Sequence, residues 1–78
     1  MSMDYTLLVR NVLINSCEVE SSLIQENSDL QRDLGLDSMG LLTLVTELEN
    51  HFGKAFDFSL ESAPKTVGEL VRYLEENV

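Results

Sequence analysis

Cysteine, proline and tryptophan are nearly absent from this chain. Its 78 residues include one cysteine, one proline and no tryptophan, and aromatic residues make up only 6% of the total. The single Cys17 cannot form a disulfide within the chain, and it leaves too few ligands for a structural zinc site. We therefore expect no bound metal, and we expect a reducing, cytoplasmic setting. With 44% hydrophobic residues and so few aromatic ones, an aliphatic helical bundle is favoured over a β-sandwich.

Basic residues are also scarce. Lys and Arg number 5 against 14 Asp and Glu, which gives a formal net charge of −9. Nucleic acids and anionic membrane surfaces are bound through clustered Lys and Arg, so we expect neither as a partner. A protein with a basic docking surface fits this charge. An equally good interpretation is that the acids only keep a small protein dissolved.

Long hydrophobic runs are missing as well. No run approaches the roughly 20 apolar residues of a membrane-spanning helix. The N-terminus does not show a basic segment followed by an apolar one, so we expect no signal peptide. The length predicts one domain, residues 1–78, with a small core. We expect a monomer, either freestanding or cut from a larger protein.

Apolar spacing predicts three main helices, over residues 3–16, 38–52 and 67–76. In each, apolar side chains recur at intervals of three and four, the period of one helical face. Gly53 is expected to end the second helix as a C-cap. Thr66 with Glu69 three positions later is a capping-box pattern at the start of the third.

The connections between these helices are long but contain apolar residues. The segment 17–36 is punctuated by Leu and Ile, which predicts that it is pinned across the bundle; a short helical turn around 21–26 is expected. In 54–65, a second helical turn is expected around 59–62. Phe56, Phe58 and Leu60 alternate as in a strand, but the chain offers no partner strand. The predicted fold is therefore all-α: a small four-helix bundle of three main helices plus one short helix.

The second helix has two distinct faces. At about 100° per residue, four apolar residues share one narrow sector, with Leu44 beside it: Leu41, Val45, Leu48 and Phe52. Met39 falls nearly opposite. Exposed methionines are common and need no function, but a soft, adaptable side chain also suits contact with several partners.

A conspicuous motif leads into this helix: Asp33-Leu34-Gly35-Leu36-Asp37-Ser38-Met39. Asp37 is the natural N-cap, since its carboxylate can accept from free backbone N–H groups of the first turn. Ser38 then lies at the positive end of the helix dipole. That position favours a negative group, such as a phosphate esterified to Ser38.

Other chemistries fit the sequence poorly. A hydrolase elbow needs G-x-S-x-G, and the first glycine is missing around Ser38. The only histidine, His51, lies thirteen residues along the same predicted helix, roughly 20 Å away. A Cys17–His51 pair lacks an orienting motif, and the acids from Asp29 onward do not match an EF-hand loop.

The motif resembles the D-x-G-x-D-S-[LM] modification site of acyl carrier proteins, and length, charge and helix order agree with that family. The resemblance implies a protein that is not an enzyme: a phosphopantetheinyl transferase would attach 4′-phosphopantetheine to Ser38, within a motif that includes Gly35, Asp37 and Met39. The arm would hold acyl groups as thioesters for synthases and acyl-transferring enzymes with basic docking surfaces. An aminoacyl, peptidyl or D-alanyl carrier is an alternative, as is a helical interaction domain without a prosthetic group.

The resemblance also implies two sets of contact residues. A docking face would comprise Met39, Leu42, Thr43, Thr46, Glu47 and Glu49. An acyl-chain pocket would be lined by Leu41, Val45, Leu48, Phe56 and Leu60. The sequence departs from fatty-acid carriers at Thr43, where an acid usually stands five residues after the serine. This favours more specialised partners, as in polyketide biosynthesis, while Leu34-Gly35-Leu36 differs from the Gly-Gly of peptidyl carriers.

Overall fold

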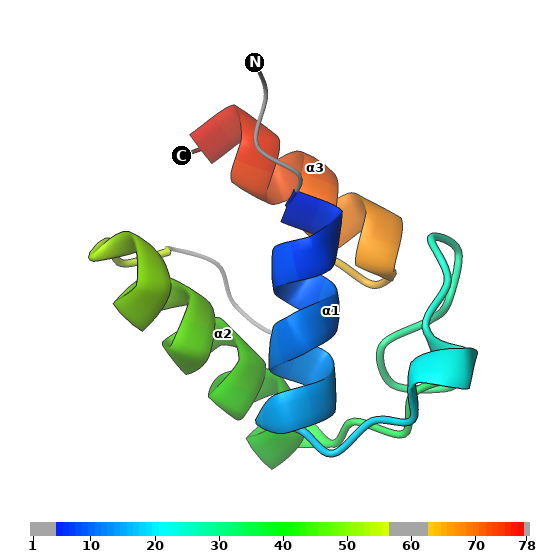
Figure 1. Cartoon of the computed structure of the whole chain (residues 1–78). Coiled ribbons are helices and arrows are strands. Elements are labelled where there is room, and N and C mark those ends of the chain that lie inside the picture. Colours follow the sequence, from blue (N-terminus) through cyan, green and yellow to red (C-terminus); the bar gives the residue numbers. More distant parts are fainter. Residues whose placement is uncertain (1–4, 57–62, 78) are drawn as a thin grey trace.

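Three α-helices make up most of the backbone that the computed structural model describes, which covers residues 5–56 and 63–77 (Figure 1). The elements are α1 (Tyr5–Asn15), the 3₁₀ turn η1 (Ser21–Leu23), α2 (Ser38–Phe52) and α3 (Val67–Asn77). Within the described residues no strand occurs, and a single antiparallel bridge pairs Asp29 with Thr66. The all-α prediction is confirmed.

The predicted helix boundaries agree closely with those observed, except that the start predicted at residue 3 lies outside the described residues. The first helix ends at Asn15, one residue earlier than predicted, and the predicted turn around 21–26 is limited to Ser21–Leu23. Gly53 ends α2 in the left-handed conformation expected of a C-cap, with φ 64°. Thr66 Oγ1 accepts from the N–H of Glu69 at 3.1 Å, as the capping-box pattern requires. The short helix predicted around 59–62 lies outside the described residues.

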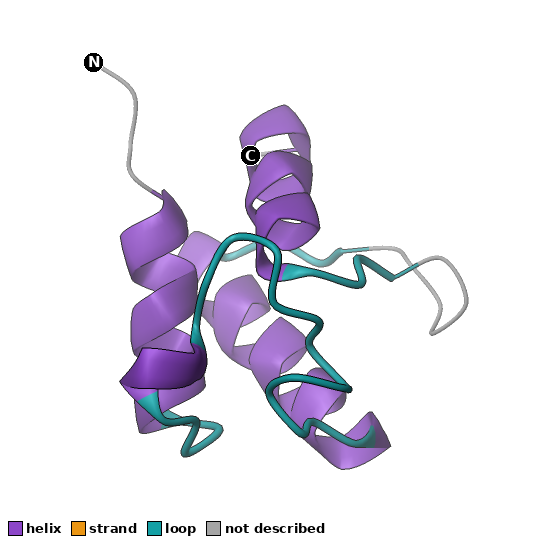
Figure 2. Ribbon diagram, turned by 90° about the vertical axis from the view of Figure 1, so that its right-hand side faces the viewer, coloured by secondary structure: helices purple, strands orange, loops and turns teal. Residues whose placement is uncertain are grey.

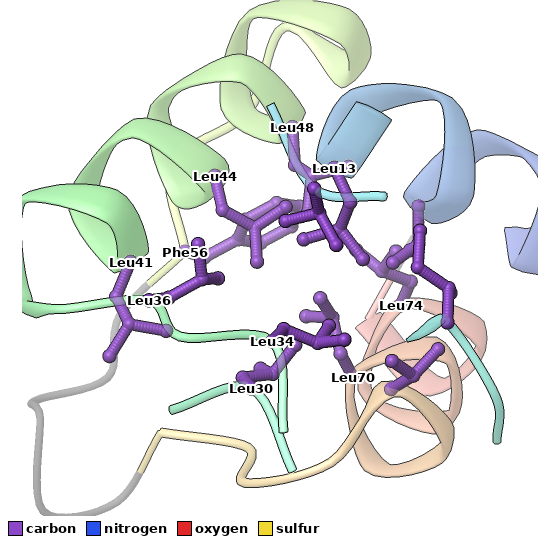
Figure 3. Close-up of a cluster of buried hydrophobic side chains, with 14 residues drawn as sticks. Leu13, Leu30, Leu34, Leu36, Leu41, Leu44, Leu48, Phe56, Leu70 and Leu74 are labelled. Atoms are coloured by element: carbon purple, nitrogen blue, oxygen red, sulfur yellow. The ribbon is translucent and has the colours of Figure 1, made fainter. Parts of the chain in front are cut away.

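The first helix holds the other two together. Helix α1 packs against both α2 and α3, and Figure 1 shows it between them, with α2 beside its lower half. The side chains that are almost completely buried come from all three helices: Val9, Leu13, Leu44, Leu48, Val67 and Leu74 (Figure 3). Each such leucine contributes about 1.5–3 kcal/mol relative to an exposed one. This shared core orients the start of α2.

The core face of α2 is rotated slightly from the predicted sector. Leu41, Leu44 and Leu48 are buried, while Val45 and Phe52 are only half-buried. The prediction that Leu44 merely flanks the core was wrong, because that side chain is 1% exposed. Both Leu44 and Val45 also line the cavity described below.

The long connection from 16 to 37 is pinned to the bundle, as predicted (Figure 2). Its buried side chains are Val19, Ile24, Ser28, Leu30, Leu34 and Leu36. Its backbone is also bonded to the start of α3: Leu30 N–H donates to Lys65 C=O at 2.8 Å, and Gly68 N–H to Glu26 C=O at 2.7 Å. These bonds satisfy backbone groups that burial would otherwise leave unpaired.

An aromatic row closes the bundle beyond the end of α2. Phe56 is buried, and its ring meets those of Phe52 and Tyr73 edge-on, with centroids 6.1 and 5.6 Å apart. Tyr5 continues the row from α1, with its centroid 5.6 Å from that of Phe52. Edge-to-face pairs of this kind add roughly 0.5–1.5 kcal/mol each beyond burial. Phe58 and Leu60, which alternate with Phe56 in the sequence, lie outside the described residues.

Candidate functional site at the start of α2

Asp37 caps α2 and thereby sets the position of Ser38. The backbone at Asp37 is extended, and its Oδ1 accepts from Gly40 N–H at 2.8 Å. Ser38 follows as the first residue of the helix, and its side chain is exposed. The amides of Ser38 and Met39 have no carbonyl partner within the helix, and they contribute to the positive end of its dipole. The hydroxyl therefore stands in solvent where a negative group is stabilised.

The turn before the cap depends on a glycine. Gly35 has φ 73°, a left-handed conformation that is costly for most other residues. The chain then returns so that Leu36 N–H donates to Leu30 C=O at 3.0 Å, and the Leu36 side chain is buried. Burial of Leu36 anchors the backbone one residue before Asp37. Gly35 therefore stands in the motif at a position where the backbone needs a left-handed conformation.

An apolar cavity opens beside Ser38. Its volume is about 330 Å³, at the lower end of the range of about 300–1,000 Å³ usual for ligand pockets. The residues that line it are Leu30, Ser38, Met39, Leu41, Leu42, Leu44, Val45, Ala63, Pro64 and Leu70. Among these described lining residues, Ser38 alone carries a hydroxyl, and the other side chains are apolar.

Only part of the predicted pocket lines this cavity. Leu41 and Val45 do, whereas Leu48 and Phe56 are buried in the core and are not among its described lining residues. Leu60 lies outside the described residues. Four of the lining residues were not predicted, because they come from segments outside α2: Leu30, Ala63, Pro64 and Leu70.

Four of the six predicted docking residues are uncharged, and two are acids. Met39 and Leu42 are 69% and 59% exposed, respectively, and both also border the cavity. Thr43 and Thr46 lie on the outer side of α2, where Thr43 Oγ1 donates to Met39 C=O at 3.0 Å. The strip that these four residues form is uncharged.

The two acids that flank this strip have different surroundings. Glu47 is exposed, and its charge acts on the thiol of Cys17. Glu49 is half-buried, and its Oε2 accepts from the backbone N–H of Phe56 at 2.8 Å. The negative charge of Glu49 is therefore directed at the chain's own backbone.

Cys17 and His51 have surroundings that do not suggest a catalytic role. Burial, and secondarily the negative charge of Glu47, raise the pKa of the Cys17 thiol. Its Sγ lies 3.8 Å from Gly40 C=O. His51 is exposed near the far end of α2, edge-on to Phe52.

No group of three or more potential metal ligands occurs among residues 5–56 and 63–77. Within the same ranges, no helix combines the length and the apolar character that crossing a membrane requires.

Comparison with known proteins identifies the class to which this site belongs. The family described as the phosphopantetheine attachment site matches residues 8–74. The chain belongs to this family, that of the acyl carrier proteins, and it is a carrier, not an enzyme.

Two relatives illustrate the match. The acyl carrier protein of Thermotoga maritima is 37% identical over 71 residues, 90% of this chain and 86% of that protein. The acyl carrier protein of Lactobacillus acidophilus is 29% identical over 69 residues, 88% of this chain and 86% of that protein. The family predicted from the sequence is confirmed.

The geometry fits the prosthetic group of this family. Attachment requires an accessible hydroxyl and an environment that tolerates a phosphodiester, and the exposed Ser38 at the positive end of α2 offers both. Asp37 keeps the helix start fixed through its bond to Gly40.

Proposed function

We propose that Ser38 is the residue to which 4′-phosphopantetheine is attached, and that the chain carries acyl groups between enzymes. One observation carries this proposal: the exposed hydroxyl of Ser38 stands at the positive end of α2 and at the edge of an apolar cavity. The chemistry that the group supplies when attached is a terminal thiol, which holds an acyl group as a thioester.

The residues of the chain itself bind and present the cargo. Asp37 fixes the first turn of α2, and the amides of Ser38 and Met39 stabilise a phosphodiester on the serine. The carrier performs no bond change of its own. Tethering raises the local concentration of the cargo at each partner enzyme, which replaces a bimolecular encounter with an intramolecular one.

The apolar cavity is proposed as the place where the acyl chain shelters from water. Leu41 and Val45 belong to its wall on α2, and Leu30 and Leu70 line it from other segments. Burial of each methylene there contributes about 0.8 kcal/mol. A lining of this kind favours a hydrocarbon cargo over a small, charged aminoacyl group.

The partners are proposed to be a phosphopantetheinyl transferase and acyl-transferring or synthase enzymes in the cytoplasm. The strip formed by Met39, Leu42, Thr43 and Thr46 offers apolar contacts and hydroxyls next to the modified serine. The exposed Glu47 adds a negative charge at its edge. Enzymes with apolar docking sites bordered by basic residues are complementary to this strip.

The attachment site is tested by loading the apo-protein with coenzyme A and a broad-specificity transferase, followed by intact mass spectrometry. The wild type and Ser22→Ala, which alters another exposed serine, should each gain one arm; Ser38→Ala should gain none. A wild type that gains no mass would favour an interaction domain without a prosthetic group. Modification of Ser38→Ala would show that the site lies elsewhere. Cargo class is then read by offering acyl and aminoacyl donors to the loaded protein.

A further inference from the structure

Gly40 is the third residue of α2, directly after Ser38 and Met39. Alanine is favoured over glycine inside a helix, so a glycine here weakens the turn that carries the candidate attachment site. Backbone conformation does not explain its position, because Gly35 and Gly53 are the described glycines with a left-handed conformation. The reason is therefore sought in the space around Gly40.

The space beside Gly40 is filled by Leu36. A Cβ added to Gly40 would lie 3.1 Å from Leu36 Cδ2, 3.4 Å from Leu36 Cβ and 3.5 Å from Asp37 Oδ1. Carbon atoms in favourable contact are about 3.5–4.0 Å apart, so the added carbon and Cδ2 would have to separate by at least about 0.4 Å. Leu36 can therefore pack this closely against α2 because residue 40 has no side chain.

Leu36 is poorly placed to move away from such a side chain. It is 7% exposed and lies among the core residues (Figure 3), and its N–H donates to Leu30 C=O at 3.0 Å. Gly40 is held as well: its N–H donates to Asp37 Oδ1 at 2.8 Å, and its C=O lies 3.8 Å from Cys17 Sγ, just beyond the end of α1. A side chain at residue 40 would therefore shift the start of α2.

We propose that Gly40 is a positioning residue for the modification of Ser38. Because it has no side chain, Leu36 and the Asp37 cap close on the first turn of α2 and fix the direction of the serine hydroxyl. This inference rests on the proposed function and names a residue outside the motif on which attachment depends.

The attachment step is sensitive to this direction. Ser38 Oγ bonds to the phosphorus that bears pantetheine, the diphosphate bond of coenzyme A breaks, its nucleotide leaves, and the hydroxyl proton passes to a base of the transferase. Such a step needs the reacting atoms about 3–3.5 Å apart and aligned, so a displacement of less than about 1 Å already slows it. Crowding at residue 40 should therefore be read in the rate of the step.

The test measures initial rates of attachment to the full chain with coenzyme A, a broad-specificity transferase and intact mass spectrometry. Gly40→Ala should lower kcat about tenfold and leave KM within about twofold, because the added methyl faces the buried Leu36 and not the predicted docking residues. The double variant Leu36→Val/Gly40→Ala lacks Cδ2 and should regain most of kcat, measured against Leu36→Val alone. Gly68→Ala crowds the start of α3 instead and should keep the kcat of the wild type.

A second measurement needs no transferase. In the NMR spectrum of the apo-protein, the backbone amide signals of Asp37 and Ser38 should move in Gly40→Ala. They should return toward their wild-type positions in the double variant, because the contact with Cδ2 is then absent.

Four outcomes would overturn the inference. One is a Gly40→Ala variant with the kcat and amide signals of the wild type. Another is a loss confined to KM, which would assign Gly40 to contact with the transferase. The third is a kcat that does not recover in the double variant, and the fourth is an equal loss in Gly68→Ala, which would reflect stability alone. Failure of the proposed function is read separately, because the wild type would then gain no mass.

Discussion

The Oε2 atom of Glu49 lies 2.8 Å from the backbone nitrogen of Phe56, whose N–H donates to it. This bond joins the last turns of α2 to the segment that follows, and it fixes the backbone at a buried aromatic ring. An acid that sequence reasoning assigned to partner docking therefore has a bond within the fold. A carboxylate that satisfies a part-buried amide is costly to remove, because the amide then loses its acceptor.

We expect Glu49→Ala to lower the free energy of unfolding by about 1–3 kcal/mol, since the N–H of Phe56 would be left without its partner. Urea denaturation followed by circular dichroism measures this. Glu49→Gln keeps an acceptor oxygen and should retain part of the stability. Glu47→Ala alters an exposed acid of the same helix and should change stability by less than about 0.5 kcal/mol. Equal losses in Glu47→Ala and Glu49→Ala would contradict the structural assignment.

Most of the fold could be predicted because its signals are local. Apolar spacing, the glycine after Phe52 and the Thr66–Glu69 pattern each act within one or two helical turns, and all three were confirmed. The position of Ser38 at the helix start followed in the same way from Asp37. Local sequence signals were therefore enough to predict the helices and the candidate attachment site.

The cavity could not be predicted from the same signals. Its walls come from Leu30, Pro64 and Leu70 as well as α2, and no local pattern records that these segments meet. An ideal helical wheel ranks Val45 and Leu44 by angle alone, whereas the burial of each side chain depends on which segments of the folded chain pack against it. Glu49 was predicted to contact a partner for the same reason, since the group that it binds is seven residues away, beyond the end of the helix.

Asp37 provides a second prediction. Its Oδ1 accepts the amide of Gly40, so Asp37→Ala should destabilise the protein by about 0.5–2 kcal/mol, the usual cost of losing an N-cap. Asp37→Asn and Asp37→Ser keep an oxygen that can accept this bond, and they should recover most of the loss. Thermal unfolding of the three variants checks the expectation. If Asp37→Asn were as unstable as Asp37→Ala, the negative charge would matter more than the bond.

The thiol of Cys17 should react slowly with iodoacetamide at neutral pH. Burial raises its pKa above the ordinary value of 9.0, and the charge of Glu47 raises it further by disfavouring the thiolate. Glu47→Gln should lower this pKa and speed alkylation at any fixed pH below it. Glu75→Gln, an exposed acid on α3, is the control. Identical rates in the wild type and Glu47→Gln would exclude the influence of Glu47.

The same shift gives the direction of a pH effect on stability. The unfolded thiol ionises at its ordinary pKa, while the folded thiol keeps its proton to higher pH. The stability from the protonated thiol is thus fully present below 9.0 and is lost as pH rises through the folded pKa. Over that range the wild type should lose stability more steeply than Cys17→Ala. Parallel curves from denaturation at a series of pH values would contradict this.

Gly68 provides a test of the bond between the long connection and α3. A Cβ at this position would lie 2.8 Å from Glu26 Cγ and 3.0 Å from Glu26 C=O, the same oxygen that accepts the Gly68 amide. Alanine in a helix is intrinsically favoured over glycine by about 1 kcal/mol, but crowding of this kind costs about 1–3 kcal/mol. The two effects oppose each other, and the backbone oxygen cannot move without breaking its hydrogen bond.

We therefore expect Gly68→Ala to destabilise the protein by about 1 kcal/mol in urea denaturation, against the helix propensity. The double variant Glu26→Ala/Gly68→Ala removes the Cγ contact and leaves the carbonyl contact. Compared with Glu26→Ala alone, it should still show most of the loss, because the backbone oxygen is the group that cannot yield. A gain in stability for Gly68→Ala would mean that residues 25–28 shift at little cost, and that the connection is held less firmly than its hydrogen bonds to the start of α3 indicate.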